Sequence, residues 1–80
     1  MRTPNPDALL VLDRVAWDVA LARTRLRTNV ALAEATGISR SRIYAIRSGY
    51  IPPAAARDRI AHALDTRASD LWREVRPTKP

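Results

Sequence analysis

The chain of 80 residues is long enough for one domain with a modest hydrophobic core. It has no cysteine, which excludes disulfide bonds and thiolate metal sites, and it shows neither a signal-peptide pattern nor the roughly 18 consecutive apolar residues of a membrane span. Its 14 basic residues outnumber its 8 acidic residues, giving a net charge of +6, and a small basic domain favours polyanionic partners. We therefore expect a soluble cytoplasmic protein that binds a polyanion.

The first predicted element is a helix over residues 6–23. Asn5 can cap this helix, and Pro6 suits its first position. Asp7 places a negative charge in the first turn, where the helix dipole favours an anion. Residues 1–5 are expected to form a flexible lead-in.

Two apolar stripes run along this predicted helix. The stripe assigned to the core consists of Leu9, Leu12, Ala16, Val19 and Ala20. The second stripe consists of Leu10, Trp17 and Leu21 and has two interpretations. It packs against the last helix of the chain, or it stays exposed as a dimer or partner surface.

Two short helices joined by a tight turn are predicted next. Thr28 can cap a helix over residues 29–36, and Ser39 can cap a helix over residues 40–47. Gly37 lies between them, where the chain must leave one helix and change direction. Glycine adopts the left-handed conformation that commonly ends a helix without a side-chain penalty.

The second of these helices has a distinctive exposed face. Ile43 and Ile46 lie three residues apart on one side and are expected to be buried, as are Val30, Ala33 and Leu32 of the preceding helix. At about 100° per residue, the face away from the core then carries Ser41, Tyr44, Ala45 and Ser48, with Arg40, Arg42 and Arg47 on its flanks. The major groove of B-DNA admits one helix, with base edges at its centre and phosphates at both rims.

This segment resembles the helix-turn-helix of the lambda-repressor-like family, which includes phage repressors, Cro proteins and their bacterial relatives. The resemblance rests on Ala33, Gly37, Ile38, the run SRSRI, Ile43, Ile46 and Gly49. Downstream, PPAAARDRIAHAL is similar to the fourth helix of the family and TRASDLW to the start of its fifth, so the resemblance covers about residues 15–75. Arg27 departs from the pattern, since the family usually has an apolar residue there.

The resemblance implies an all-α fold, a compact five-helix bundle in one domain over residues 6–75. The last two helices are expected over 53–64 and 68–75. Ile60 and Leu64 should face the core in the first, and Trp72 should close the core in the second. Residues 76–80 are expected to be flexible.

The resemblance also implies a sequence-specific regulator that binds an operator in double-stranded DNA, in the host-cell cytoplasm or nucleoid, such as a bacteriophage repressor or a Cro-like protein. Relatives often dimerise, so we expect either a weak homodimer or monomers that pair on DNA. The expected base contacts are Arg40, Ser41, Tyr44 and Ala45. The expected phosphate contacts are Thr28, Asn29, Ser39, Arg42, Arg47 and Ser48.

Two alternatives remain open. SRIYAIRSGYIPP is also similar to the winged helices of excisionases and MerR-like proteins, which bend DNA, although these require two strands after Gly49. A module that does not bind DNA, such as an antitoxin or adaptor, would use Leu10, Trp17 and Leu21. No enzyme activity, metal, cofactor or small-molecule ligand is expected, because His62 is the only histidine and has no cysteine or paired carboxylates beside it.

Overall fold

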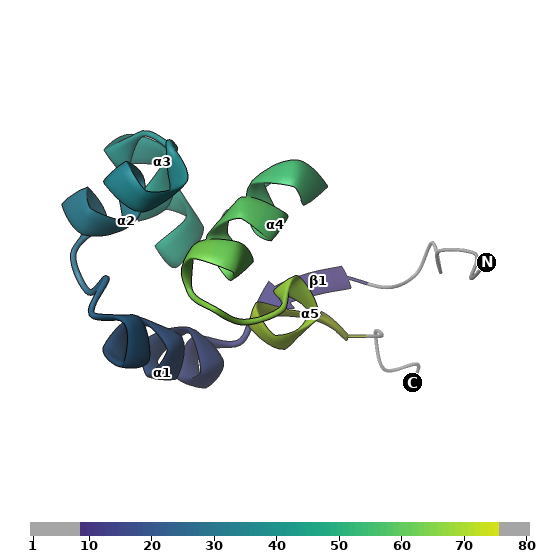
Figure 1. Ribbon diagram of the computed structural model, residues 1–80. Coiled ribbons are helices and arrows are strands. Elements are labelled where there is room, and N and C mark those ends of the chain that lie inside the picture. The colour runs from purple at the N-terminus through teal and green to yellow at the C-terminus, as the bar shows by residue number, and fades with distance from the viewer. Residues whose placement is uncertain (1–8, 76–80) are drawn as a thin grey trace, which may run out of the picture.

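The computed structural model describes residues 9–75, which form five helices and two short strands (Figure 1). In chain order these are β1 (Leu9–Leu12), α1 (Arg14–Thr24), α2 (Asn29–Thr36), α3 (Arg40–Arg47), α4 (Ala54–Ala63), α5 (Ala68–Leu71) and β2 (Trp72–Val75). Helices α2 and α3 lie at one end of the molecule, and the strands lie at the other end with α5 (Figure 1). The five helices confirm the helical part of the predicted fold class, and the sheet corrects the prediction of an all-α protein.

The first predicted helix is wrong over residues 9–12, which form strand β1. Helix α1 begins at Arg14, because Asp13 caps it and its side chain accepts a hydrogen bond from the backbone N–H of Ala16 at 3.0 Å. Four consecutive aliphatic residues precede this cap, and such a run suits a strand when a partner strand is present. The predicted start at Asn5 and Pro6, and both predicted flexible ends, lie outside the described residues.

The last predicted helix, 68–75, is also wrong in its second half. Helix α5 ends at Leu71, and Trp72 takes the extended conformation that begins β2. The two strands are antiparallel, pairing Leu9 with Val75 and Leu12 with Trp72. The backbone N–H of Asp13 donates to the Leu71 carbonyl at 2.7 Å and joins the two ends of the described chain just beyond the sheet.

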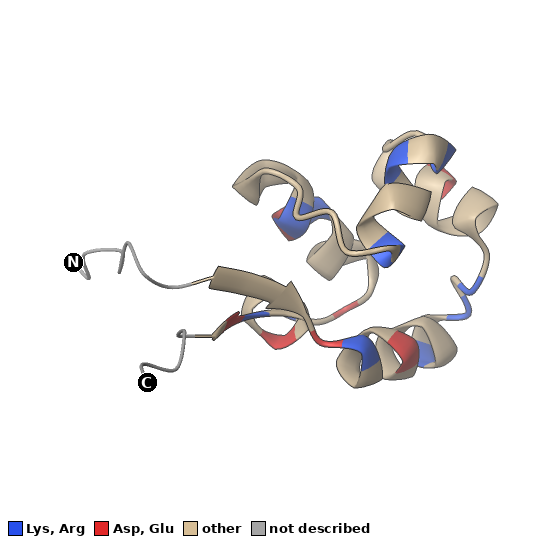
Figure 2. Cartoon of the chain, turned by 180° about the vertical axis from the view of Figure 1, so that it is seen from behind, with Lys and Arg blue, Asp and Glu red and all other residues tan. Residues whose placement is uncertain are grey.

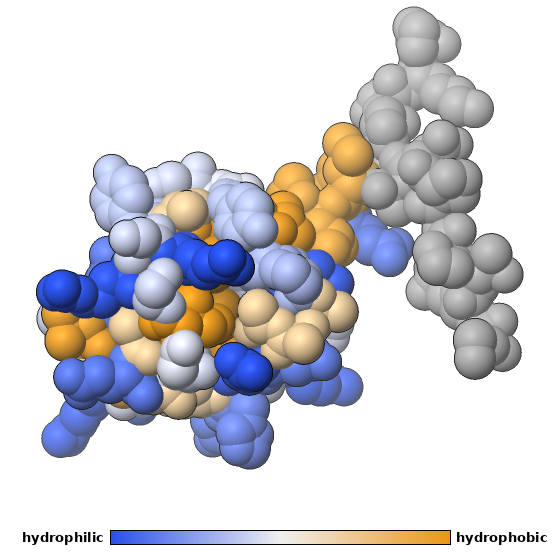
Figure 3. Space-filling model, turned by 90° about the horizontal axis from the view of Figure 1, so that it is seen from above, coloured by the Kyte–Doolittle hydropathy of each residue, from blue (hydrophilic) through white to orange (hydrophobic). Residues whose placement is uncertain are grey.

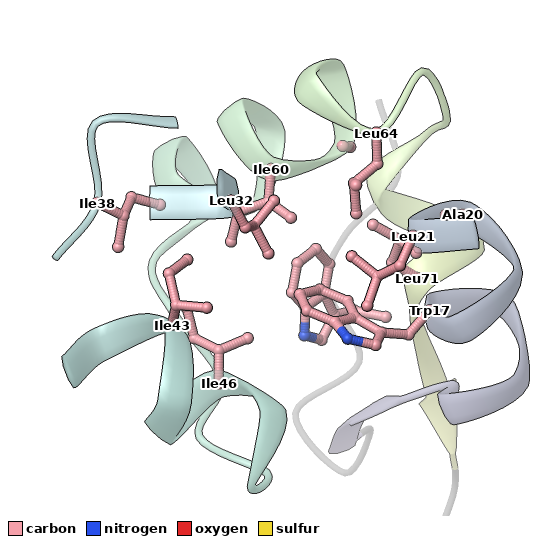
Figure 4. Close-up of a cluster of buried hydrophobic side chains, with 12 residues drawn as sticks. Trp17, Ala20, Leu21, Leu32, Ile38, Ile43, Ile46, Ile60, Leu64 and Leu71 are labelled. Atoms are coloured by element: carbon pink, nitrogen blue, oxygen red, sulfur yellow. The ribbon is translucent and has the colours of Figure 1, made fainter. Parts of the chain in front are cut away.

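One hydrophobic core lies between the helices and the strand pair (Figure 4). Ile43 and Ile46 enter it from α3 and are 0% and 1% exposed, so the predicted inward face of this helix is confirmed. Trp17 of α1 meets Trp72 of β2 edge to face, with ring centroids 6.1 Å apart and planes at 69°. The other large buried side chains are Leu21, Leu32, Ile38, Ile60, Leu64 and Leu71.

The predicted core face of the first helix is only partly correct. Ala20 is buried and Ala16 and Leu12 pack against the core, but Leu9 and Val19 are exposed. Trp17 and Leu21 are buried instead, with Trp17 against Trp72 of β2, so these two residues form no exposed dimer surface. Leu10, the third residue of that stripe, lies in strand β1 and is half-buried. Once α1 begins at Arg14, turning its larger Trp and Leu side chains inward removes more apolar area from water than turning the valines inward.

Helix α2 likewise buries a leucine and leaves a valine exposed. Val30 was expected to face the core and is exposed, whereas Leu32 is almost fully buried and Ala33 packs against the core. Helix α4 begins at Ala54, one residue after its predicted start, and buries Ile60 as expected. Within residues 9–75, no helix has the length and apolar character that crossing a lipid bilayer would require.

The buried isoleucines of α3 give a direct test of this core. Ile43→Ala should lower the free energy of unfolding by about 2–5 kcal/mol, because it removes buried methyl groups and leaves a cavity. Val15→Ala is the matched control, since Val15 is exposed on α1 and its change should fall within about 0.5 kcal/mol. Urea denaturation followed by tryptophan fluorescence measures both values. Equal effects of the two substitutions would contradict the burial of α3.

Candidate nucleic-acid interface

Helices α2 and α3 are built by local capping interactions. The Thr28 hydroxyl accepts from the N–H of Ala31 at 3.0 Å at the start of α2, and the Ser39 hydroxyl accepts from the N–H of Arg42 at 3.3 Å at the start of α3. Both caps agree with the sequence prediction. Because a hydroxyl that accepts a hydrogen bond still has a proton to donate, capping leaves Thr28 and Ser39 able to bind an anion.

The turn between the two helices depends on one glycine and one threonine. Gly37 has φ +74°, in the left-handed region, and its N–H donates to the Ala33 carbonyl at 2.8 Å. Thr36 is buried, and its hydroxyl donates to the Leu32 carbonyl at 2.8 Å and accepts from the N–H of Ile38 at 3.2 Å. This second set of bonds was not anticipated from the sequence, and it fixes the direction in which the chain enters α3.

The outer face of α3 carries most of the predicted base contacts. Arg40, Ser41 and Tyr44 are exposed, whereas Ala45 is half-buried because the chain folds back over it and the N–H of Tyr50 donates to its carbonyl at 2.9 Å. The face is therefore polar and cationic at its N-terminal half. Seen from above, strongly hydrophilic groups lie on both sides of a hydrophobic strip that reaches the edge of the molecule (Figure 3).

Arg47 is held in a hydrogen-bond network that sequence reasoning missed. Its Nη1 donates to Oδ1 of Asn29 at 2.7 Å and to the Arg27 carbonyl at 3.4 Å. Arg14 of α1 donates in turn to the Arg47 carbonyl at 2.9 Å. The network connects the end of α3 to the start of α2 and to α1, and only proximity in the fold reveals it, because Asn29 and Arg47 are 18 residues apart.

This network changes what Arg47 and Asn29 can offer a ligand. Both were predicted to contact phosphate independently, yet both are half-buried and bonded to each other. The bond occupies the Asn29 oxygen and therefore orients its amide so that the N–H donors point away from Arg47. Ser48, the last predicted phosphate contact, is exposed at the end of α3 and follows directly after this network.

A hollow lies beside the start of α3, and it is lined by Arg42 together with residues of the loop after α3 and of α4. It has a volume of about 270 Å³, and its lining includes Ser39, Arg42, Tyr50 and Arg59. Arg59 comes from α4 and is exposed. The sequence carries no signal that would place it beside Arg42, since that proximity depends on how α4 packs.

The positive charge at this end of the molecule is not neutralised within the described chain. Between residues 9 and 75, the ion pairs join Arg67 to Asp70 at 3.8 Å and Arg73 to Asp13 at 3.9 Å, both at the strand end. No carboxylate of this part of the chain pairs with Arg40 or Arg42. The basic residues are spread over several elements, including α1, α3 and the connection between α1 and α2 (Figure 2).

Comparison with known proteins gives no independent assignment. No model of a known family matches this chain, and neither a curated protein nor a solved structure matches it. Across residues 9–75, no cluster of three or more His, Asp or Glu side chains could hold a metal ion.

Gly37 allows the α2–α3 turn to be tested without touching the outer face of α3. A Cβ atom at this position would meet no atom within 4 Å, so Gly37→Ala should destabilise the fold only through its backbone conformation, by about 1–2 kcal/mol. Gly37→Asn should lose less, because asparagine tolerates the left-handed region. Urea denaturation of the three proteins measures this order. Equal stability of Gly37→Ala and the parent chain would contradict the turn geometry.

Proposed function

We propose that this protein is a sequence-specific regulator that binds double-stranded DNA through a helix-turn-helix formed by α2 and α3. The observation that carries the proposal is the complete burial of Ile43 and Ile46, which turns Arg40, Ser41 and Tyr44 to the surface. A short helix with a polar centre and cationic flanks fits the major groove in width and in hydrogen-bonding character. A phage-type repressor or Cro-like protein, which occupies a promoter and excludes polymerase, fits these features best.

The contacts divide into two groups by position. Arg40 and Ser41 lie in the first turn of α3, the part of a recognition helix that leads into the groove, and Arg40 is suited to a bidentate contact with a guanine edge. Tyr44 and Ala45 would meet thymine methyl groups or the sugar-phosphate wall. These residues supply base preference.

The proposed phosphate contacts lie on either side of the residues that supply base preference. Arg42 and Arg59 share the hollow beside the start of α3, which suits a single backbone phosphate between two guanidinium groups. On the other side, Asn29 presents its amide at the N-terminus of α2, where backbone N–H groups and the helix dipole also favour an anion. Arg47 supports this second contact by orienting Asn29.

The two alternatives from the sequence have less support. A winged helix needs a pair of strands after α3, but residues 54–63 form α4, and β2 pairs with β1 at the opposite end of the chain. An adaptor that binds through Leu10, Trp17 and Leu21 would need an exposed stripe, but Trp17 and Leu21 are buried.

Selection of bound duplexes from a random pool tests the proposal. Recovery of one sequence motif supports sequence-specific binding and gives the symmetry of the site. Failure to bind any duplex at micromolar protein and low salt would refute the proposal.

Arg40→Ala tests the assignment of base readout. The substitution should cost about 1–3 kcal/mol of binding free energy at the selected site and relax the base preference at one position. Fluorescence anisotropy with the selected duplex and with a scrambled duplex measures both effects. An equal loss on the two duplexes would show that Arg40 does not read a base.

Arg42→Ala tests the assignment of phosphate binding. Binding should weaken by a similar factor on every duplex, and the slope of log affinity against log salt should fall in magnitude by about one. Arg67→Ala is the matched control, since it removes the same charge from an exposed residue near α5, at the other end of the molecule. The same change in slope for both variants would indicate a general charge effect in place of a contact.

A further inference from the structure

The hollow between the start of α3 and α4 has an apolar floor. Ile38 and Ile46 line it and are 9% and 1% exposed, at the α2 and α3 side of the core (Figure 4). The buried Pro52 and the half-buried Ala56 add to this apolar floor. A backbone phosphate of DNA would use the arginines at the rim, and it has no apolar group to cover these four residues. Binding to DNA therefore leaves the floor unexplained.

The rim of the hollow carries positive charge that the described chain does not neutralise. Arg42 of α3 and Arg59 of α4 both line the hollow and are exposed. Between residues 9 and 75, neither guanidinium group forms an ion pair with a carboxylate. Ser39 and Tyr50 add two hydroxyl groups to the same lining, and the Ser39 hydroxyl keeps its proton while it caps α3. Four donor groups and two positive charges therefore line one hollow.

Hydrogen bonds fix the loop that forms one wall of the hollow. The N–H of Tyr50 donates to the Ala45 carbonyl at 2.9 Å, which holds the loop against α3. Nη1 of Arg57 donates to the Pro52 carbonyl at 2.7 Å, which holds the same loop against α4. Because these bonds form within the protein alone, a ligand does not have to order this wall when it binds.

We propose that the hollow binds a small organic phosphate, a phosphate monoester with one aromatic or short aliphatic group. A monoester carries close to two negative charges near neutral pH, which the two guanidinium groups balance. Its terminal oxygens accept hydrogen bonds from guanidinium and hydroxyl donors, while its carbon group covers the apolar floor. The volume of about 270 Å³ corresponds to about nine water molecules at about 30 Å³ each, so it suits a ligand of about ten non-hydrogen atoms.

Such a ligand would also control access of DNA to this end of the molecule. The phosphate of the ligand and a backbone phosphate of DNA require the same two arginines, so one excludes the other. This second step rests on the proposed function, whereas binding of the ligand itself does not. Because so small a ligand gains little free energy in total, we expect a Kd of about 1 mM.

Titration of the full chain without DNA tests the site, with phenyl phosphate as the probe. Backbone amide shifts of the ¹⁵N-labelled protein should saturate at Ser39 and Ala56, at constant ionic strength of about 0.15 M. Inorganic phosphate lacks the ring and phenol lacks the charge, so each should bind at least about tenfold more weakly. Absence of saturable shifts at these residues would overturn the site, and equal affinity for inorganic phosphate would overturn the role of the apolar floor.

Arg59→Gln tests the charged rim. It should weaken binding of phenyl phosphate about tenfold, because it removes one of two charge-assisted contacts. Arg67→Gln is the matched control, since it removes the same charge from an exposed residue near α5 and should bind like the parent chain. Equal weakening by both substitutions would show a general charge effect and would overturn the assignment.

Ala56→Leu tests the apolar floor. The larger side chain should occupy the hollow and weaken phenyl phosphate to the affinity of inorganic phosphate. Ala55→Leu is the matched control, because Ala55 is exposed beside it on α4 and does not line the hollow. Near-ultraviolet circular dichroism of the packed Trp17 and Trp72 shows that both variants fold. Unchanged affinity in a folded Ala56→Leu would contradict binding in this hollow.

Fluorescence anisotropy with the selected duplex tests the competition. About 10 mM phenyl phosphate, ten times the expected Kd, should weaken DNA binding about tenfold relative to sodium chloride of the same ionic strength. Unchanged DNA affinity would overturn the competition. Failure to bind any duplex would instead refute the proposed function, and the titration without DNA would still decide whether the hollow binds an organic phosphate.

Discussion

Packing of α3 against the other helices determines which of its side chains are exposed. Those side chains form the polar, cationic surface at the end of the molecule where α2 and α3 lie. A helix of eight residues is too short to be stable alone in water, since isolated helices need about 12–15 residues even with favourable sequences. Burial of Ile43 and Ile46 therefore supplies both the stability of α3 and its rotation about its axis. Any other rotation would bury arginine or serine in a core that offers them no partners.

The pair of strands β1 and β2 holds α1 in place at the opposite end of the molecule, as the buried isoleucines hold α3. It joins the two ends of the described chain, and the bond between Asp13 and Leu71 and the contact between Trp17 and Trp72 extend that connection into the helices. Helix α1 is thereby held against α5. The Arg14 side chain of α1 also donates a hydrogen bond to the Arg47 carbonyl at the end of α3. Helix α1 therefore connects the part of the molecule that contains the two strands with the part that contains α2 and α3.

The elements that the sequence predicts correctly are those whose determining residues are close together in the chain. The caps Thr28 and Ser39 and the turn at Gly37 each act within three or four residues, and α2 and α3 have the predicted bounds. The sheet depends on residues as distant as Leu9 and Val75, and no local pattern distinguishes an aliphatic run in a helix from one that finds a distant partner. The bond between Arg47 and Asn29 and the hollow shared by Arg42 and Arg59 are equally non-local, so the exposed face of α3 was predictable and its support was not.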